Sequence, residues 1–198
     1  MQVTLVGSPS QARAWRRAFA DTSIEIITGD ILYYAQGAAV VSPANSFGFM
    51  TGGLDLAIRH VYEKAGCDIT ALVQRVIRDE AHGELPVGQA LVVPTPGYSA
   101  DSYVALVVAP TMRLPHPVPW SLNAYLAFRA ILWTTERWNI AHPDSPLDHL
   151  YCSGLATGIG LMSVRRSARQ MRAAWDQVMC PPATISSLAA RACQEMHW

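Results

Sequence analysis

The sequence lacks net charge, closely spaced cysteines and long apolar runs. Fifteen basic residues balance fifteen acidic ones, so the chain as a whole has no positive field that would attract nucleic acid or an anionic membrane. An anionic ligand must therefore be held by local geometry. The chain also has no run of about eighteen apolar residues, and its N-terminus lacks the basic and apolar segments of a signal peptide. These absences lead us to expect a cytoplasmic protein with no membrane partner.

The cysteines and histidines do not form a metal-ligating pattern. The four cysteines are Cys67, Cys152, Cys180 and Cys193, and no two of them form a Cys-x-x-Cys pair. The six histidines show neither HxH nor HxxxH spacing. We therefore expect reduced thiols, no metal site and no cofactor.

Strand-like and helix-like segments alternate along the 198 residues, and a hydrophobic content of 51% is sufficient for a substantial core. Short β-branched or apolar runs predict strands at residues 2–6, 23–27, 38–42, 89–93, 103–109 and 150–154. Helical spacing of apolar residues predicts helices at 12–20, 54–65, 69–77, 122–138 and 164–178, and a further short helix is expected within 185–196. This alternation favours an α/β architecture in which a mostly parallel sheet lies between helical layers. We expect one domain spanning residues 1–198.

The stretch at residues 40–55 contains the first candidate site. A short apolar run ends in a loop that begins near Asn45, closes with Gly52 and Gly53, and leads into a helix whose first turn contains Asp55. An apolar strand, a glycine-bearing loop and a helix start are typical of a site for phosphate and sugar groups.

A second loop, at residues 155–162, has similar chemistry and lies between a predicted strand and a helix capped by Ser163. Its glycines let backbone N–H groups approach an anion, and a helix N-terminus adds about half a positive charge. Because loops meet at the carboxyl ends of parallel strands, the two loops together could hold a diphosphate without a lysine. The alternative for Gly158 and Gly160 is a tight turn with close packing.

Neither loop carries the motif of a common nucleotide-binding enzyme. No Gly-Lys-Ser or Gly-Lys-Thr follows either loop, which disfavours a P-loop ATPase. Gly158 and Gly160 also lack the third glycine of a dinucleotide fingerprint, since Ser163 stands there.

Three motifs in this order resemble those of the macrodomain family. The run Ser42-Pro43-Ala44-Asn45 followed by Gly52-Gly53-Leu54-Asp55-Leu56-Ala57-Ile58 is similar to the family signature, in which Asn-Ala-Ala-Asn leads into a glycine run and a Val-Asp-x-Ala-Ile helix start. Thr28-Gly29-Asp30-Ile31 is similar to the Gly-Asp-Ile that precedes this signature, and Ala156-Thr157-Gly158-Ile159 resembles the second loop, Ser-Thr-Gly-Ile. The spacing from Asn45 to Asp55 resembles that of the hydrolytic members.

The resemblance implies a three-layer α/β/α fold with a mixed, mostly parallel sheet. It also implies that the protein binds ADP-ribose. It implies that Asp30 accepts a hydrogen bond from the adenine amino group and that Ile31 supplies a backbone N–H nearby. Asn45 would reach the distal ribose and Asp55 would lie beside it, which makes these two residues the catalytic candidates. The diphosphate would be held by the amides of Thr157, Gly158, Ile159 and Gly160, with Gly52 and Gly53 closing from the other side.

Three of these residues also have ordinary structural explanations. Asp30 could cap a turn, since Asp is common at such positions. Asn45 could bind the backbone of its own loop. Asp55 could serve only as an acidic residue in a first helical turn, which the helix dipole favours by about 0.3–1 kcal/mol.

The sequence departs from the family pattern at the distal ribose. The family commonly has an aromatic residue two positions after the glycine of its second loop, whereas Leu161 and Met162 follow Gly160 here. Phe49 or Met50 could take the place of that aromatic residue.

We expect the protein to bind ADP-ribose and to hydrolyse mono-ADP-ribosyl linkages. Its partners would be ADP-ribose or an ADP-ribosylated macromolecule, with nucleic acid only as an ADP-ribosylated substrate. One alternative is a non-catalytic ADP-ribose reader or nucleotide-metabolite sensor. Another is a structural or phage-associated interaction domain that uses the proline-rich loop at residues 114–119.

Four arginines occur in the last predicted helix: Arg165, Arg166, Arg169 and Arg172. We expect them on its outer side as a solvated face. The alternative is contact with the modified partner of the ligand or with a nucleic acid.

Overall fold

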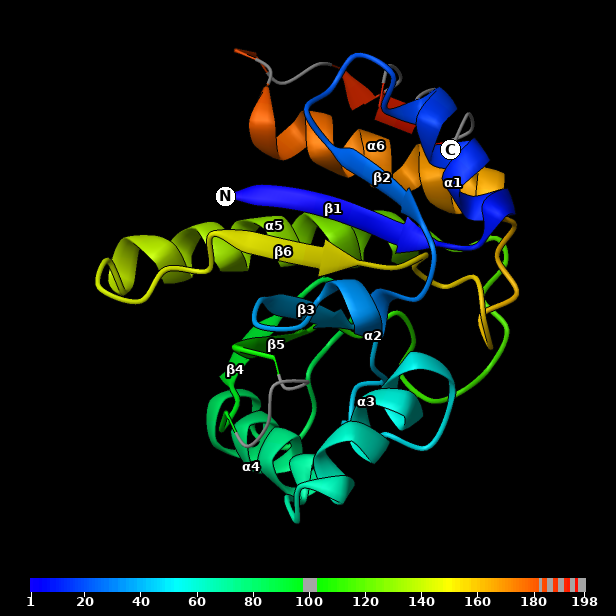
Figure 1. The fold of residues 1–198 in the computed structure, drawn as a ribbon. Helices are drawn as coiled ribbons and strands as arrows, with labels where there is room; N and C mark the ends of the chain where they lie inside the picture. The colour runs from blue at the N-terminus through cyan, green and yellow to red at the C-terminus, as the bar shows by residue number, and fades with distance from the viewer. Residues whose placement is uncertain (98–102, 182, 185–186, 189–190, 193–194, 196–198) are drawn as a thin grey trace.

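The computed structural model describes residues 1–97, 103–181, 183–184, 187–188, 191–192 and 195. Cys193 and much of the segment 185–196, where a short helix is predicted, lie outside the described residues. Within the described part of the chain, six strands form one sheet in the order β2-β1-β6-β3-β5-β4 (Figure 1). The strands are β1 (Gln2–Gly7), β2 (Glu25–Thr28), β3 (Ala39–Ser42), β4 (Leu91–Pro94), β5 (Ala105–Val108) and β6 (His149–Cys152).

The sheet is mixed and mostly parallel, as predicted. β2, β1, β6, β3 and β5 pair in parallel, and β4 pairs antiparallel with β5 at one edge. Every residue of β3 and β5 is buried, which is the pattern of central parallel strands covered on both faces. Because these five strands run the same way, the loops that follow them lie along one edge of the sheet.

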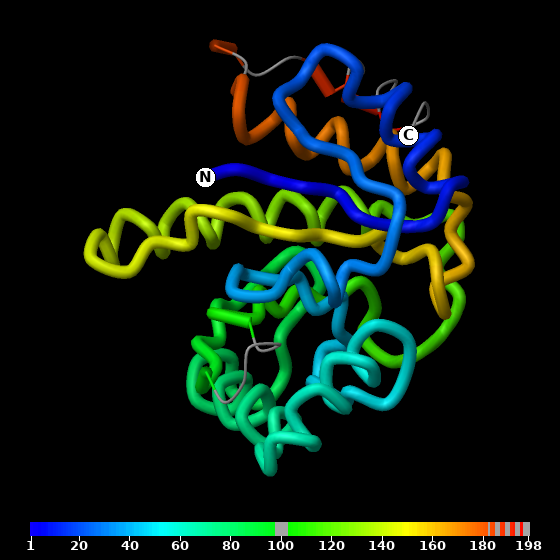
Figure 2. Tube along the Cα trace, in the orientation of Figure 1, coloured from blue at the N-terminus to red at the C-terminus, as the bar shows by residue number. Residues whose placement is uncertain are grey.

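Helices cover both faces of the sheet, which confirms the three-layer α/β/α fold. The helices are α1 (Pro9–Ala18), α2 (Ile31–Tyr34), α3 (Gly53–Lys64), α4 (Ile69–Ala81), α5 (Asn123–Ala141) and α6 (Val164–Met179). One core contains Trp15 of α1, Phe128 of α5 and Met171 of α6, and the other contains Ile31 of α2 and Ile58 of α3. Figure 2 follows the chain between these layers. Among the described residues, no helix has the length and apolar character needed to cross a membrane.

Capping residues account for the helix starts nearest the sheet edge. Ser8 caps α1 by accepting a hydrogen bond from the N–H of Gln11, whose side chain in turn accepts the N–H of Ser8, so the two residues form a capping box. Ser163 caps α6 in the predicted way, through the N–H of Arg166. The sequence did not predict α2, because a helix of four residues is too short to give a periodic pattern.

The prediction that all four arginines of α6 lie on its outer side is wrong for Arg172. Its guanidinium is partly buried and contacts the Asp21 carboxylate, the Asp176 carboxylate and the Ala18 carbonyl. These carboxylates raise the pKa of Arg172 above its usual value. Arg172 therefore joins α6 to the end of α1.

Candidate functional site

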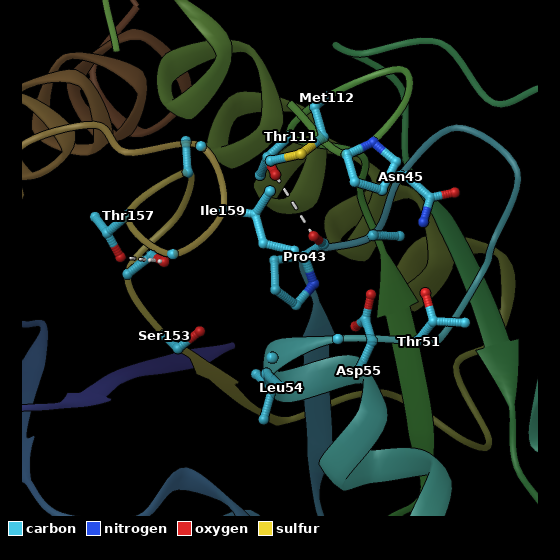
Figure 3. A pocket seen from close by; sticks show the side chains of 18 of the residues that line it. Pro43, Asn45, Thr51, Leu54, Asp55, Thr111, Met112, Ser153, Thr157 and Ile159 are labelled. Atoms are coloured by element: carbon cyan, nitrogen blue, oxygen red, sulfur yellow. Dashed lines mark hydrogen bonds between the residues drawn. The ribbon is translucent and has the colours of Figure 1, made fainter. Parts of the chain in front are cut away.

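A cavity of about 230 Å³ lies at the carboxyl edge of the sheet, between the β3–α3 loop and the β6–α6 loop (Figure 3). The loop after β5 forms a third side. The lining residues are Pro43, Ala44, Asn45, Phe49, Thr51, Gly52, Gly53, Leu54, Asp55, Thr111, Met112, Pro115, Ser153, Gly154, Ala156, Thr157, Gly158, Ile159 and Gly160. The fold thus brings both sequence-predicted loops to one hollow.

Asp55 is a buried carboxylate that faces this cavity from the first turn of α3. The residue is 6% exposed, and its Oδ1 accepts a 2.7 Å hydrogen bond from the hydroxyl of Ser42 at the end of β3. Burial raises the pKa of Asp55 from 3.8 to about 6, although the Ser42 hydrogen bond acts in the opposite direction. A carboxyl group whose pKa lies near neutrality, in a cavity, has the property of a proton acceptor.

Asn45 lines the cavity, but its side chain also stabilises its own loop. Its Oδ1 accepts the N–H groups of Phe47 at 3.1 Å and Phe49 at 3.3 Å, and its Nδ2 donates to the Phe49 carbonyl at 2.9 Å. Asn45 therefore binds the backbone of its own loop, which is the structural explanation considered in the sequence analysis. A primary amide has two N–H donors, so one remains for a ligand.

The start of α3 lines the cavity, and its first backbone N–H groups have no side-chain cap. Gly52 is the N-cap and has no side chain to satisfy them, and the first intrahelical bond runs from the N–H of Leu56 to the Gly52 carbonyl. Gly53 has a φ of 56°, a conformation that glycine adopts readily. A methyl group on Gly52 would lie 3.4 Å from Cδ1 of Ile159, so the two loops approach each other closely across the cavity.

The loop from Thr157 to Gly160 has the geometry of an anion-binding loop. None of its four amides donates a hydrogen bond to a protein group within the described residues. The loop is closed by hydrogen bonds from the N–H of Met162 to the Ala156 carbonyl and from the N–H of Leu161 to the Gly158 carbonyl, at 3.0 and 2.9 Å. Successive free amides in such a turn form a concave site for an anion.

This loop also contains strained backbone conformations and a closely packed glycine. Ala156 and Leu161 have φ values of 59° and 52°, which cost about 1–3 kcal/mol each in residues other than glycine. A methyl group on Gly160 would lie 2.5 Å from the Ala156 carbonyl oxygen, so this position requires glycine. Close packing is therefore a sufficient reason for glycine at position 160, whether or not its amide also binds a ligand.

Gln11 is a site-supporting residue that the sequence analysis did not identify. Its Nε2 donates to the Thr157 hydroxyl at 3.1 Å, and that hydroxyl donates to the Gly154 carbonyl at 3.1 Å. The pattern Ser8-x-x-Gln11 signals a capping box in the sequence. It gives no sign that the same side chain fixes a loop 146 residues away.

Asp30 and Ile31 lie outside the residues that line the cavity. Both follow β2 at the same sheet edge, where Asp30 is exposed and accepts the N–H of Leu32 at 3.0 Å as the N-cap of α2. The capping explanation considered for Asp30 therefore applies. Its second carboxylate oxygen has no hydrogen-bond partner among the described residues.

Of the two residues considered as replacements for the missing aromatic, only Phe49 is at the site. Met50 is 1% exposed and belongs to the core beneath α3 and α4, so a role for it in the ribose pocket is wrong. Phe49 is 48% exposed and lines the cavity. Leu161 and Met162 do not line it.

Comparisons with known proteins agree with this arrangement. The family model of the Macro domain matches residues 41–171. The macrodomain of Mycobacterium tuberculosis DarG aligns with a TM-score of 0.58 at 18% identity, covering 76% of this chain and 88% of that chain. The Oceanobacillus iheyensis macrodomain with ADP aligns with a TM-score of 0.55 at 20% identity, covering 75% of this chain and 72% of that chain. Thermosipho africanus DarTG in complex with ADP-ribose aligns with a TM-score of 0.53 at 14% identity. The alignment covers 87% of this chain and 50% of that chain. At these identities the structural likeness establishes the fold, and no curated sequence matches the chain.

The burial of Asp55 predicts a measurable effect on stability. Folding raises the pKa of Asp55 from 3.8 to about 6, so the folded state holds the carboxyl proton more tightly than the unfolded state does. Stability is therefore lost as the pH rises through that range. At about pH 7.5, Asp55→Asn should raise the free energy of unfolding by on the order of 1–3 kcal/mol, since the amide keeps the Ser42 hydrogen bond without a charge. Chemical denaturation measures this, with the exposed Asp144→Asn as the matched control.

At about pH 4 the difference between wild type and Asp55→Asn should disappear, because the carboxyl group is then mostly protonated in the folded state. An Asn variant that is less stable than wild type at neutral pH would contradict the raised pKa.

Proposed function

The chain belongs to the macrodomain family, whose model matches residues 41–171, and from this membership we propose that it binds ADP-ribose and hydrolyses mono-ADP-ribosyl linkages. The observation that carries the proposal is the pairing of four uncommitted amides at residues 157–160 with a buried carboxylate at Asp55, in one cavity. The amides suit a diphosphate and the carboxylate suits water activation.

Cavity size suggests how the ligand divides between two regions. At about 230 Å³ the cavity is smaller than the roughly 300–1,000 Å³ of a typical small-molecule site. In our proposal it holds the diphosphate and distal ribose, between the β6–α6 loop and the start of α3. The adenine then lies along the sheet edge towards the free carboxylate oxygen of Asp30 and the backbone of Ile31.

Asp55 has the position and pKa needed to activate water. In this scheme a water oxygen attacks the anomeric carbon of the distal ribose, and a water proton passes to the Asp55 carboxylate. The bond from that carbon to the carrier breaks with its electron pair leaving on the carrier atom, which is then protonated through solvent. Positive charge that develops on the sugar is stabilised by the same carboxylate.

A non-catalytic reader of ADP-ribose is the second candidate function. The side chain of Asn45 supports it, because three of its hydrogen bonds go to Phe47 and Phe49 and only one donor is left to orient a sugar. A reader would keep the diphosphate site and lack turnover.

Filling the space between the two loops should abolish ADP-ribose binding. Gly52 has an extended backbone, so Gly52→Leu is conformationally allowed, yet its side chain would occupy the cavity beside Ile159. We expect isothermal titration calorimetry to give a dissociation constant at least about tenfold weaker than wild type, a loss of about 1.4 kcal/mol. Gly97→Leu, where the added side chain meets no described residue within 4 Å, is the control. Absence of wild-type binding at high micromolar ADP-ribose would favour an interaction domain without a nucleotide ligand.

Release of ADP-ribose from a mono-ADP-ribosylated protein separates the enzyme from the reader. Wild type should release it at a rate that rises with pH through about 6 and then levels off, because the ionised form of Asp55 accepts the proton. Asp55→Asn should slow release by about 100-fold or more. Release that survives this substitution would remove the catalytic assignment. If wild type binds ADP-ribose but releases none, the reader function stands.

Phe49 should contribute to ribose affinity. Because its half-exposed ring lines the cavity, Phe49→Ala should weaken ADP-ribose binding by about 0.5–1.5 kcal/mol with little change in melting temperature. Phe49→Trp retains an aromatic face and should bind like wild type. Equal affinity of the Ala variant and wild type would show that the ring does not contact the sugar.

A further inference from the structure

Positive charge is concentrated on two neighbouring helices, although the chain as a whole is neutral. α1 and α6 lie side by side against one face of the sheet, as Figures 1 and 2 both show. Their 26 residues include seven arginines and one acidic residue, Asp176, a formal charge of +6. The other 172 residues therefore carry eight basic and fourteen acidic side chains, a charge of −6. Segregation of this size creates a strong local field on one face.

A groove between the two helices collects much of this charge. It has a volume of about 550 Å³ and is lined by Arg13 and Arg17 of α1 and by Arg165 and Arg169 of α6. The remaining lining residues are Ser10, Ala14, Ala18, Val164 and Ala168. All four arginines are exposed, and none of the nine lining residues is acidic.

Three of the four arginines that line the groove have no acidic partner within the described part of the chain. Arg13, Arg17 and Arg165 make no hydrogen bond or ion pair within the described part of the chain. Asp21 and Asp176 are both engaged by Arg172, which does not line the groove. The groove therefore offers cationic side chains that an external anion can contact.

The spacing of these side chains suits a repeating anion. Arg13 and Arg17, like Arg165 and Arg169, are four residues apart, so each pair lies on one helix face with a rise of about 6 Å. The guanidinium group matches the geometry of a phosphate with two parallel hydrogen bonds. Two such rows flank a floor of small side chains, in which the Ser10 hydroxyl is the one polar side-chain group besides the arginines.

From this arrangement we infer that the groove between α1 and α6 binds the phosphodiester backbone of a nucleic acid strand. Two rows of guanidinium groups suit a strand that carries the same charged group at every step, which favours a nucleic acid over an acidic peptide. Contacts to phosphates carry no sequence information, so binding is independent of base sequence. The groove shares no lining residue with the cavity at the sheet edge. The inference therefore does not depend on the proposed hydrolase function.

Fluorescence anisotropy with a labelled, unmodified single-stranded DNA of about 20 nucleotides tests the inference. If Arg13, Arg17 and Arg165 contact three phosphates, the slope of log affinity against log salt should be about −2.1 for wild type, since each contact contributes about −0.7. Arg17→Gln/Arg165→Gln should reduce the slope to about −0.7. Arg17→Glu/Arg165→Glu should weaken binding by more than about tenfold.

The matched control is Arg75→Glu/Arg129→Glu, which changes the net charge equally but alters exposed arginines of α4 and α5. It should reduce affinity much less than the groove variant. Equal loss in both double variants, no salt-dependent binding by wild type, or equally tight binding of polyglutamate would each overturn the inference. ADP-ribose titration of the groove variant should match wild type, which separates a failure here from a failure of the proposed cavity.

Discussion

Parallel pairing of the central strands is the constraint on which the candidate site depends. β3 lies between β6 and β5, and all three run in the same direction. Their carboxyl ends therefore lie next to each other, separated by about 4.8 Å per strand. The loops after β3 and β6 must face one another, although more than 100 residues separate them in the chain. The position of the site is thus fixed by the order of strands, and the loop residues supply its chemistry.

The site is also where the fold departs from its most stable arrangement. Asp55 is buried beside Ser42 at a cost to stability at neutral pH, and Ala156 and Leu161 hold left-handed conformations around the amides of the β6–α6 loop. The β6–α6 loop is held in place by the Val118 N–H, which donates to the Gly160 carbonyl at 2.8 Å, and by Gln11, which donates to the Thr157 hydroxyl. Features that reduce stability in a cleft are typical of functional sites, where activity and stability conflict.

Much of this arrangement could be predicted from sequence, because local patterns determine it. Apolar runs placed the strands, helical spacing placed the long helices, and the motifs around Asn45 and Thr157 located both loops of the cavity. Other features depend on contacts between distant segments, which no local pattern records. Examples are the Gln11 hydrogen bond to Thr157, the ion pair between Arg172 and Asp21, and the burial of Met50. The net charge of zero was misleading for a related reason, since a sum over the chain cannot show that α1 and α6 are strongly basic and the rest acidic.

The closeness of the Ile159 side chain to Gly52 has a consequence for ligand entry in the proposed function. The atom that approaches Gly52 is Cδ1, the far end of a side chain whose residue is half-exposed. Rotation of such a side chain takes picoseconds to nanoseconds, whereas rearrangement of a loop backbone takes nanoseconds to microseconds or longer. The space between Gly52 and Ile159 can therefore widen by a change of the Ile159 rotamer while the backbone amides stay in position. In the proposed function, a ligand that enters here meets backbone amides already in position, and its association rate should be set by diffusion and orientation more than by reorganisation of the protein.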